Sequence, residues 1–585
     1  MTAHPVGRTA DAASKLLTRS WKLPPRRNRV SIDAKIPVPM KDGTKLLADH
    51  YIPVTGKAAP TVLVRCPYGR GIPFSMLMAQ LVAERGYHVL LQSCRGTSGS
   101  GGDFEPMRNE VADGQDTVSW LREQGWFNGR LATYGASYLG FTQWALAMDP
   151  PPELAAAVVL VGPHDFSRSA YHNGVFDLYN FLEWSDMMAH QEHNSGMRGF
   201  VHMATAERRL RPVLDAMPIT ASARSHFGAG APWFESWLQH PDLSDEFWAP
   251  LQCGAALDRI GAPTLLVGGW HDLFIEQTIE EYTTLAARGV PARLLVGPWA
   301  HLDTTRSGPV FAESLAWLDR YLAGDRGAAE DSAAKDSAAK DSAAKDTPVR
   351  VFVGGAGQWR DLPAWPPSGT RQQPWYLAAD LRLTTSPPDQ GQAGFRYNPA
   401  DPTPSVGGAV MSQRAGARAN QGVEQRPDVL VYTSAVLTEP VEIIGEVTAS
   451  LQVTRDNPHA DLFVRLCDVD ERGVSRNVCD GIVRLGDATA LAASTTVSLL
   501  SVAHRFNPGH RIRVQVAGGA HPRFARNPGT GAVDAPPKDM KATSYLVGSA
   551  SELRLPVSET AGPQPEQEQC SGTASADALD PPHPD

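Results

Sequence analysis

Short apolar segments of strand length recur along the first 300 residues of the chain. They are continuous and rich in β-branched residues rather than alternating, which is typical of strands covered on both faces. The apolar segments are 61–65, 88–92, 131–134, 157–161, 264–267 and 293–296, and segments with helical periodicity between or after them are 75–85, 110–124, 138–148, 275–287 and 311–322. This alternation predicts a doubly wound α/β domain made of residues 31–164 and 257–327.

The alternation stops after Val161-Gly162-Pro163, and no strand pattern returns until residue 264. Residues 165–256 are instead rich in helix formers and aromatic side chains, so we predict a mostly helical cap inserted into the α/β domain. Each aromatic side chain either belongs to the core of the cap, which is the commoner situation, or lines an apolar pocket. The aromatic residues include Tyr171, Phe176, Tyr179, Phe181, Trp184, Trp233, Phe234, Trp237, Phe247 and Trp248.

The second half of the chain begins with a perfect repeat, DSAAK three times over, at 331–345. Each Asp–Lys pair favours a helix, but a five-residue period turns by about 140° per repeat, so no apolar face forms. We therefore predict a solvated spacer at 328–347. Alternating apolar and polar positions then predict an antiparallel β-sandwich, a jelly roll, over 348–557. We interpret 1–30 as an N-terminal tail and 558–585 as a disordered one.

Composition places the chain among multidomain globular proteins. Its 585 residues are too many for one hydrophobic core, and 42% of them are hydrophobic against 20% charged. The net charge of -9 comes without an extended basic stretch, which argues against a nucleic-acid partner.

Membrane association and secretion are not indicated either. No window holds 18 successive apolar residues, and the N-terminus lacks the apolar core of a signal peptide, so we expect no membrane partner and a cytoplasmic location. The six cysteines are scattered without metal-like spacing, which indicates free thiols in a reducing compartment.

The most informative motif is a candidate serine nucleophile, which would need a base within hydrogen-bonding reach and a carboxylate to orient that base. Gly-x-Ser occurs at 96–98, 135–137 and 473–475. Only the middle one lies between a strand pattern and a helix pattern, and there Gly135 leaves room for a sharp turn. Leu139 stands where the usual second glycine would be, and Gly140 follows. On this motif alone, Ser137 is either a nucleophile or a helix N-cap.

Two further strand ends carry the partners that this chemistry needs. Asp272 follows one predicted strand and His301 follows the last one, so with Ser137 they fall in the order serine, acid, histidine that α/β-hydrolases use. We therefore predict Ser137, Asp272 and His301 as the catalytic residues. His271 and Asp303 are the nearest alternatives. They rank lower because His271 would leave His301 without a role, and Asp303 would follow its own histidine too closely.

Five stretches of the sequence carry a resemblance to a known family. They are RCPY at 65–68, CRGTSGSGG at 94–102, GASYLG at 135–140, GWHD at 269–272 and GPWAH at 297–301. In this order they resemble the cocaine esterase and X-Pro dipeptidyl-peptidase family, also called the CocE/NonD hydrolases. The family's elbow has the form Gly-x-Ser-Tyr-x-Gly, so the late glycine favours Ser137 as a nucleophile. The helical insertion and C-terminal jelly roll extend the resemblance through residue 557.

The resemblance implies an α/β-hydrolase fold and a role for each residue. Ser137 would attack a carbonyl carbon, His301 would carry the proton, and Asp272 would orient His301. The backbone N–H of Tyr138 and the hydroxyl of Tyr68 would hold the oxyanion. No metal, nucleotide or other cofactor is expected.

The aromatic cap indicates a substrate with an apolar or aromatic acyl group. We predict that Trp184, Trp270 and Phe274 line the substrate pocket, and that the substrate is a small-molecule ester or amide. An X-Pro dipeptidyl-peptidase is the alternative within the family, and it would need cap carboxylates, of which Glu183, Asp186 and Glu192 are available. An alternative of another class is a catalytically inactive binding protein that keeps the fold.

Two features depart from the family pattern. Cys66 stands where many relatives have asparagine, which bears on how Tyr68 is aimed, and the DSAAK spacer has no counterpart. The glycine-rich run at 96–102 lacks both G-x-G-x-x-G and G-K-[ST], so we expect a structural loop rather than a phosphate loop. Relatives often self-associate, partly through the sandwich domain, which allows a homo-oligomer, although no heptad marks an interface.

Overall fold

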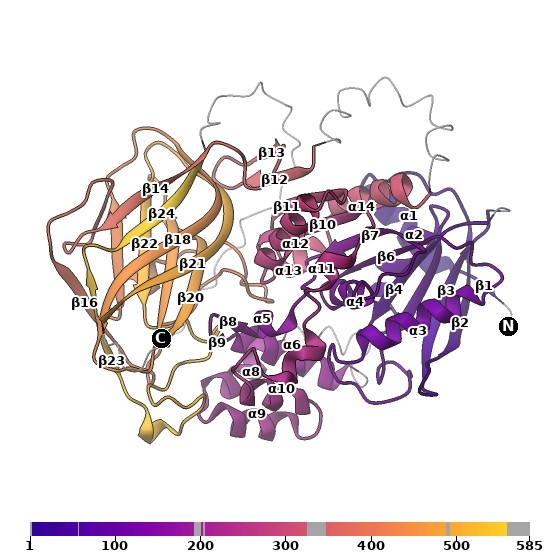
Figure 1. Ribbon diagram of the computed structural model, residues 1–585, viewed down its shortest axis with the longest axis horizontal. Coiled ribbons are helices and arrows are strands. Elements are labelled where there is room, and N and C mark those ends of the chain that lie inside the picture. Colours follow the sequence, from indigo (N-terminus) through magenta and orange to yellow (C-terminus); the bar gives the residue numbers. More distant parts are fainter. Residues whose placement is uncertain are drawn as a thin grey trace.

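The computed structural model describes residues 3–55, 58–191, 201–202, 205–323, 347–486 and 492–558. An α/β region, a helical cap and a β-rich region pack against one another, with the cap below the α/β region and the β-rich region beside both (Figure 1). The DSAAK repeat and the predicted tail beyond Ser558 lie outside the described residues.

One 11-stranded sheet runs through the α/β region, in the order β1-β2-β3-β5-β4-β6-β7-β10-β11-β12-β13. Its centre is parallel from β5 to β12 and contains all six strands that the apolar segments predict. They are β4 (Thr61–Cys66), β5 (His88–Ser93), β6 (Leu131–Ala136), β7 (Leu154–Leu160), β10 (Thr264–His271) and β11 (Ala292–Ala300). Every residue of β4, β5 and β6 is buried, as expected for strands covered on both faces.

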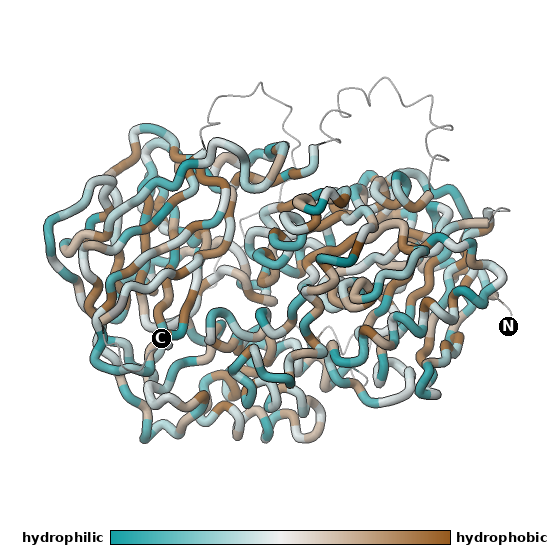
Figure 2. Tube along the Cα trace, in the orientation of Figure 1, coloured by the Kyte–Doolittle hydropathy of each residue, from teal (hydrophilic) through white to brown (hydrophobic). Residues whose placement is uncertain are grey.

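Helices pack on this sheet at the five segments with helical periodicity. They are η1 (Ser75–Gln80, a π-helix) continued by α2 (Leu81–Ala83), α3 (Glu110–Arg122), α4 (Tyr138–Leu146), α12 (Ile275–Ala287) and α14 (Gly308–Tyr321). Apolar stretches follow the interior strands, while the turns at the rims are more hydrophilic (Figure 2). Among the described residues, no helix combines the length and the apolar character that crossing a membrane requires.

The N-terminal part of the sheet was not predicted strand by strand. β2 (Val30–Pro39) and β3 (Lys45–Pro53) form an antiparallel pair, and β3 joins the sheet through β5. Their prolines and charged residues interrupt the apolar runs, so no buried-strand pattern forms. The segment interpreted as a tail also has structure: β1 (His4–Pro5) pairs with β2, and α1 (Arg8–Ser20) packs on the region through a hydrogen bond from Ser14 Oγ to Glu84.

The insertion after β7 is mainly helical, as predicted. It contains α5 (Phe166–Ala170), α6 (Leu178–His190), α8 (Ala206–Asp215), α9 (Ile219–Phe227), α10 (Pro232–Gln239), η2 (Glu246–Leu251, a 3₁₀-helix) and α11 (Ala256–Arg259). A small hairpin of β8 (Tyr171–His172) and β9 (Val175–Phe176) interrupts the helices. Several of the aromatic residues form the core of the cap, where the ring centroids of Phe166 and Trp237 are 4.9 Å apart.

The boundary predicted at 348 differs from the observed pairing. β12 (Val349–Val353) adds to β11 in parallel, and β13 (Gln358–Leu362) pairs with β12, so both strands complete the hydrolase sheet. The alternating burial of β12 resembles that of a sandwich strand because β12 lies near the edge of the sheet, where only one side chain in two packs against the core.

The remaining strands build an all-β domain. They are β14 (Thr370–Leu377), β15 (Arg382–Thr384), β16 (Gln392–Tyr397), β17 (Val429–Ser434), β18 (Val441–Arg455), β19 (Ala460–Val469), β20 (Ser475–Leu485), β21 (Ala492–Phe506), β22 (Arg511–Ala517), β23 (Thr543–Gly548) and β24 (Glu552–Ser558). Apart from β15–β17 the pairs are antiparallel, and two short helical turns, α16 (Gln421–Glu424) and η3 (Pro537–Asp539), lie in the connections. The predicted fold class, an α/β-hydrolase domain with an inserted cap and a following all-β domain, is confirmed.

Candidate active site

Three strand ends bring Ser137, Asp272 and His301 together. Ser137 follows β6, Asp272 follows β10, and His301 follows β11 and begins the short helix α13 (His301–Thr304). In the sheet β6, β7, β10 and β11 are successive parallel neighbours, so their carboxyl ends share one edge. Residues 164 positions apart in the sequence are thereby in contact: Ser137 Oγ lies 3.0 Å from His301 Nε2.

The turn at Ser137 has the strained geometry of a nucleophile elbow. Ser137 has φ 61° and ψ −122°, a conformation that L-residues rarely adopt, and its N–H donates to the carbonyl of Leu160 at 2.9 Å. A side chain at Gly135 would place its Cβ 2.4 Å from Leu139 Cβ. The glycine requirement is therefore physical, because the turn folds Leu139 back over the end of β6.

The late glycine of this motif has a separate structural reason. A Cβ on Gly140 would lie 2.5 Å from the Cα of Gly162, just after β7, so the two glycines allow α4 to cross the end of the sheet closely. A helix held this close to the strand ends fixes the backbone that follows Ser137.

Each nitrogen of His301 has one partner. Nδ1 lies 2.6 Å from Asp272 Oδ1, and Nε2 faces the hydroxyl of Ser137. Both the imidazole and the carboxylate are buried, at 3% and 0% exposure. Asp272 also accepts from the backbone N–H of Phe274 at 3.2 Å, and the Phe274 ring packs edge-on to His301 with 5.3 Å between ring centroids. A proton on Nδ1 leaves the lone pair of Nε2 directed at Ser137.

The two alternative residues have other surroundings. The His271 ring lies on the side of the all-β domain, 3.7 Å from the position of a Cβ on Gly416, and burial lowers its pKa to about 4. The carboxylate of Asp303 accepts from the backbone N–H of Ala300 at 3.1 Å. Asp272 contacts His301, and His301 contacts Ser137, so these two residues are the acid and the base of the arrangement.

Tyr68 and Tyr138 border the Ser137 hydroxyl. The Tyr68 hydroxyl shares a hydrogen bond with Ser137 and accepts another from Trp184 Nε1 at 3.1 Å. Burial raises the pKa of Tyr68 well above its usual range, so the phenol keeps its proton and can donate it in a hydrogen bond. Tyr138 is the first residue of α4, and a backbone N–H at that position has no intrahelical partner.

A buried ion pair that the sequence analysis missed fixes the side chain of Tyr138. Its hydroxyl donates to Glu110 at 2.7 Å and accepts from the N–H of Met107 at 2.9 Å. Glu110 in turn pairs with Arg65 at 2.8 Å, and both residues are nearly inaccessible to solvent. The Arg-Cys-Pro-Tyr stretch contained this arginine, but an isolated carboxylate 45 residues later gave no signal of the pairing.

Cys66 is buried between Arg65 and Pro67, two residues before Tyr68. Burial raises the pKa of its thiol to about 12, so Cys66 stays neutral beside Tyr68. The thiol therefore contributes no charge to the site.

Aromatic side chains form one wall of the site. The ring of Trp184, from α6, stacks on that of Tyr138 at 6.2 Å between centroids and 11° between planes. Phe104 and Trp233 pack on Trp184 at 6.4 and 6.3 Å, and neither was predicted as a pocket residue, because single aromatics in a loop and in the cap carry no distinguishing pattern. Trp184 thus adjoins Tyr68, and Phe274 adjoins His301.

Trp270 packs toward the β12–β13 segment and also lines a cavity of about 740 Å³ beside His271. Its Nε1 donates to the carbonyl of Phe352 at 2.6 Å, and its ring packs 5.7 Å from that of Trp365. It joins β10 to the segment around β12 and β13.

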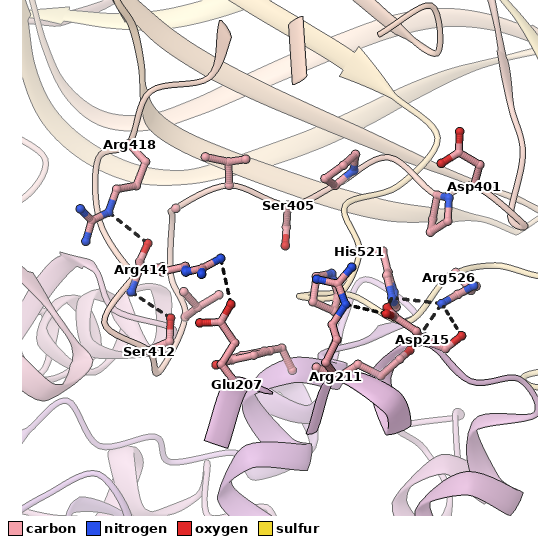
Figure 3. A pocket seen from close by; sticks show the side chains of 18 of the residues that line it. Glu207, Arg211, Asp215, Asp401, Ser405, Ser412, Arg414, Arg418, His521 and Arg526 are labelled. Atoms are coloured by element: carbon pink, nitrogen blue, oxygen red, sulfur yellow. Dashed lines mark hydrogen bonds and ion pairs between the residues drawn. The ribbon is translucent and has the colours of Figure 1, made fainter. Parts of the chain in front are cut away.

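The described residues enclose two sizeable cavities. One, of about 770 Å³, opens between the cap and the all-β domain, where Asp215 of α8 faces His521 and Arg526 (Figure 3). The other, of about 740 Å³, lies between the α/β region, which contributes Trp270, His271 and Asp303 among others, and the all-β domain. Ser137 lines neither of them, so the contacts around Ser137, not these cavities, define the site.

Comparison with known proteins agrees with this geometry. A family model described as X-Pro dipeptidyl-peptidase (S15 family) matches residues 42–303, and the C-terminal non-catalytic domain of the same enzymes matches residues 342–553. The cocaine esterase of Rhodococcus sp. (strain MB1 Bresler) is 30% identical over 555 residues, which cover 86% of this chain and 93% of the relative. The chain belongs to the X-Pro dipeptidyl-peptidase (S15) family. The resemblance drawn from the sequence motifs is confirmed, and this S15-family protein is a serine hydrolase.

Solved structures share the whole architecture of this S15-family chain. An α-amino acid ester hydrolase has a TM-score of 0.74 at 23% identity and covers 91% of this chain and 97% of its own. An aminopeptidase from a marine sediment archaeon of the Thaumarchaeota also has a TM-score of 0.74 at 23% identity, with 90% and 96% coverage. At this identity the likeness shows the fold alone.

Proposed function

We propose that the protein is a carboxylic ester hydrolase that works through an acyl-enzyme on Ser137. The observation that carries this proposal is the continuous chain of contacts from Asp272 through both nitrogens of His301 to Ser137 Oγ. An unactivated serine hydroxyl is a poor nucleophile near neutral pH, and this arrangement supplies the base that activates it.

The proposed reaction has two halves with one proton carrier. His301 Nε2 accepts the proton of Ser137 as Oγ bonds to the acyl carbon, and the carbonyl oxygen becomes an oxyanion held by Tyr138 N–H and the Tyr68 hydroxyl. His301 then gives the proton to the leaving alkoxide as its C–O bond breaks. A water molecule attacks the acyl-enzyme by the same route, which releases the carboxylic acid and restores Ser137. Asp272 stays ionised throughout and stabilises the imidazolium.

The neighbourhood of Tyr68 supports an apolar or aromatic acyl group. Trp184, Phe104 and Trp233 present their rings next to the proposed oxyanion hole. Such a wall gains free energy from burying apolar surface and offers few hydrogen bonds to a polar substrate.

An X-Pro dipeptidyl-peptidase is the second candidate, and one observation favours it. Glu183 precedes Trp184 on α6, and its buried Oε2 has no hydrogen-bond partner, so it could hold a substrate amine. Asp186, by contrast, already accepts from Arg209 and contacts the Nε2 atoms of two histidines, and Glu192 lies outside the described residues. A single available carboxylate makes the peptidase the weaker proposal.

Purified protein assayed with a series of p-nitrophenyl acyl esters beside a Gly-Pro p-nitroanilide separates the two candidates. We expect release of p-nitrophenol, faster with longer or aromatic acyl groups, and little hydrolysis of the anilide. Activity confined to the anilide would replace the esterase with the peptidase. Ser137→Ala is the control for both substrates, and a Ser98→Ala variant controls for the other Gly-x-Ser of this domain.

The cytoplasmic location and self-association remain predictions of the sequence. The five described cysteines are buried and unpaired, which supports a reducing compartment for the folded protein. Light scattering of the purified protein tests whether it forms a homo-oligomer.

A further inference from the structure

The cap contains a second cluster of histidines around one aspartate, which the proposed hydrolysis does not use. Asp186, on α6, is 1% exposed. His202 Nε2 lies 2.8 Å from its Oδ2, and His226 Nε2 lies 2.8 Å from its Oδ1. Arg209 Nη1 is 2.6 Å from that same Oδ1, and His190 Nδ1 is 3.5 Å from it. Side chains from four segments, α6, residues 201–202, α8 and α9, thus converge on one buried carboxylate.

The spacing of these groups fits one metal ion. Asp186, His190 and His202 each offer a ligand atom, and the three atoms lie within 4.8 Å of one another. Around a tetrahedral ion with bonds of about 2.0–2.2 Å, ligand atoms are roughly 3.4 Å apart. Bringing the three atoms onto one cation requires the two imidazoles to rotate, and His190 Nδ1 must leave the backbone carbonyl of Asp186, which is now 2.8 Å away.

The hydrogen bonds of His202 are in conflict without such an ion. Its Nε2 lies 2.8 Å from a carboxylate oxygen of Asp186 and 2.9 Å from Nη2 of Arg209. A ring nitrogen either carries a proton and donates or has a lone pair and accepts, so one of these two contacts is always unfavourable. A cation bound to the lone pair of His202 and to the carboxylate would satisfy both groups at once.

The charges around the cluster also favour a cation. Burial raises the pKa of Glu183 to about 7, and the negative charges of Asp186 and Glu207 add to this effect. Arg209 now provides the compensating positive charge, but its side chain is 28% exposed and its buried Nε has no hydrogen-bond partner. Arg209 can therefore turn outward when a cation enters. The cation then replaces the guanidinium as the positive charge that neutralises the carboxylates.

We propose that Asp186, His190 and His202 bind a divalent transition-metal ion of the Zn²⁺ class, with His226 as the fourth ligand once Arg209 is displaced. Imidazole nitrogens select such ions over Mg²⁺ and Ca²⁺, which require oxygen ligands. The ion would join α6 to residues 201–202 and to α9, so its role would be to stabilise the cap. No step of the proposed hydrolysis involves it.

Metal titration of the full-length protein tests the site directly. The protein is stripped with EDTA, dialysed and titrated with ZnCl₂ in a calorimeter, with CoCl₂ in a parallel absorption experiment. We expect one tight equivalent of Zn²⁺ per chain, the intense d–d bands of tetrahedral Co²⁺, and no binding of MgCl₂. Absence of a one-to-one Zn²⁺ site, or Co²⁺ bands of an octahedral ion only, would overturn the proposal.

Three variants with a matched control locate the ion. His202→Ala and Asp186→Asn should lose the tight equivalent, while His240→Ala should retain it, because His240 lies elsewhere in the cap and stacks on Phe247. Arg209→Met should bind Zn²⁺ more tightly than wild type, since the guanidinium no longer competes for Asp186. Full binding in a correctly folded His202→Ala protein, checked by circular dichroism, would contradict the assignment. These readouts are independent of ester hydrolysis.

Discussion

Two buried aspartates in this molecule each contact histidine, yet they build different chemistry. Asp272 contacts one imidazole, and that imidazole contacts one hydroxyl, so each hydrogen-bonding atom of His301 has a single partner. Asp186 is shared among His202, His226 and Arg209, and His202 faces two partners with opposite requirements. The first arrangement fixes one tautomer, whereas the second leaves it undecided.

The difference shows what a general base requires beyond an acid and a histidine close together. A base needs a lone pair that faces the proton it removes, and this follows only when the other nitrogen has one fixed acceptor. The strand ends of a rigid sheet supply that fixed geometry. The helices of the cap converge on a carboxylate from four segments, which suits the binding of a cation better than proton transfer.

The largest expected effect comes from removing the charge that fixes the tautomer. Asp272→Asn should lower kcat for a p-nitrophenyl ester about ten-thousandfold, because an amide can donate to Nδ1 and favour the unproductive tautomer. Asp303→Asn, at the rival acid, should lower kcat less than tenfold. Equal losses in the two variants would show that the single-partner geometry of His301 is not what matters.

A smaller effect is expected at the oxyanion. Tyr68→Phe removes one donor and should lower kcat by roughly a hundredfold to a thousandfold with little change in KM. Trp184→Phe removes the hydrogen bond to the Tyr68 hydroxyl and part of the ring surface that stacks on Tyr138, and it should cost at most about tenfold. Steady-state kinetics of both variants with the same ester checks this order, and a Tyr68→Phe enzyme as active as wild type would remove Tyr68 from the oxyanion hole.

The pH dependence of kcat/KM should depend on the Asp272–His301 pair and not on the histidines around Asp186 in the cap. Because only a neutral imidazole can accept the proton of Ser137, kcat/KM should fall as the pH is lowered into the acid range, by up to about tenfold per unit. A rate that does not fall in acid would exclude His301 as the base. The profile of a His226→Ala variant should keep the same shape, since that histidine belongs to the cap.

The cap cluster should instead appear in stability. Burial alone would raise the pKa of Asp186, but hydrogen bonds from His226 and Arg209 outweigh it and hold the pKa well below its usual range. A depressed pKa stabilises the fold above the unfolded value of about 4, and this contribution is lost as the pH falls below it. In EDTA at pH 7, the free energy of unfolding of Asp186→Asn should therefore be about 2 kcal/mol lower than that of the wild type. Urea titrations at pH 7 and pH 3 check that the difference shrinks in acid.

The sequence predicted those parts of the molecule in which a residue pattern is compatible with only one kind of secondary structure. The continuous apolar runs predicted all six central strands, and their order brought Ser137, Asp272 and His301 to one edge. The pairing of β12 with β11 could not be predicted, because alternation marks a strand with one buried face and does not say which sheet it joins.

Contacts between distant side chains could not be predicted in the same way. Glu110 supports Tyr138 from another element, and His202 and His226 reach Asp186 from different parts of the cap. No spacing in the sequence marks such pairs, since the fold alone determines which residues meet. The metal-like spacing that was sought among cysteines is absent, while histidines without regular spacing converge in the folded cap.

Labelling with a fluorophosphonate probe tests the central claim most directly, namely that His301 activates Ser137. Intact-protein and peptide mass spectrometry should find one adduct, on Ser137, in the wild-type protein. Ser137→Ala should carry none, and His301→Ala should react far more slowly. An unlabelled wild-type protein, or equal labelling of Ser137→Ala, would contradict the account and favour an inactive binding protein that keeps the hydrolase fold.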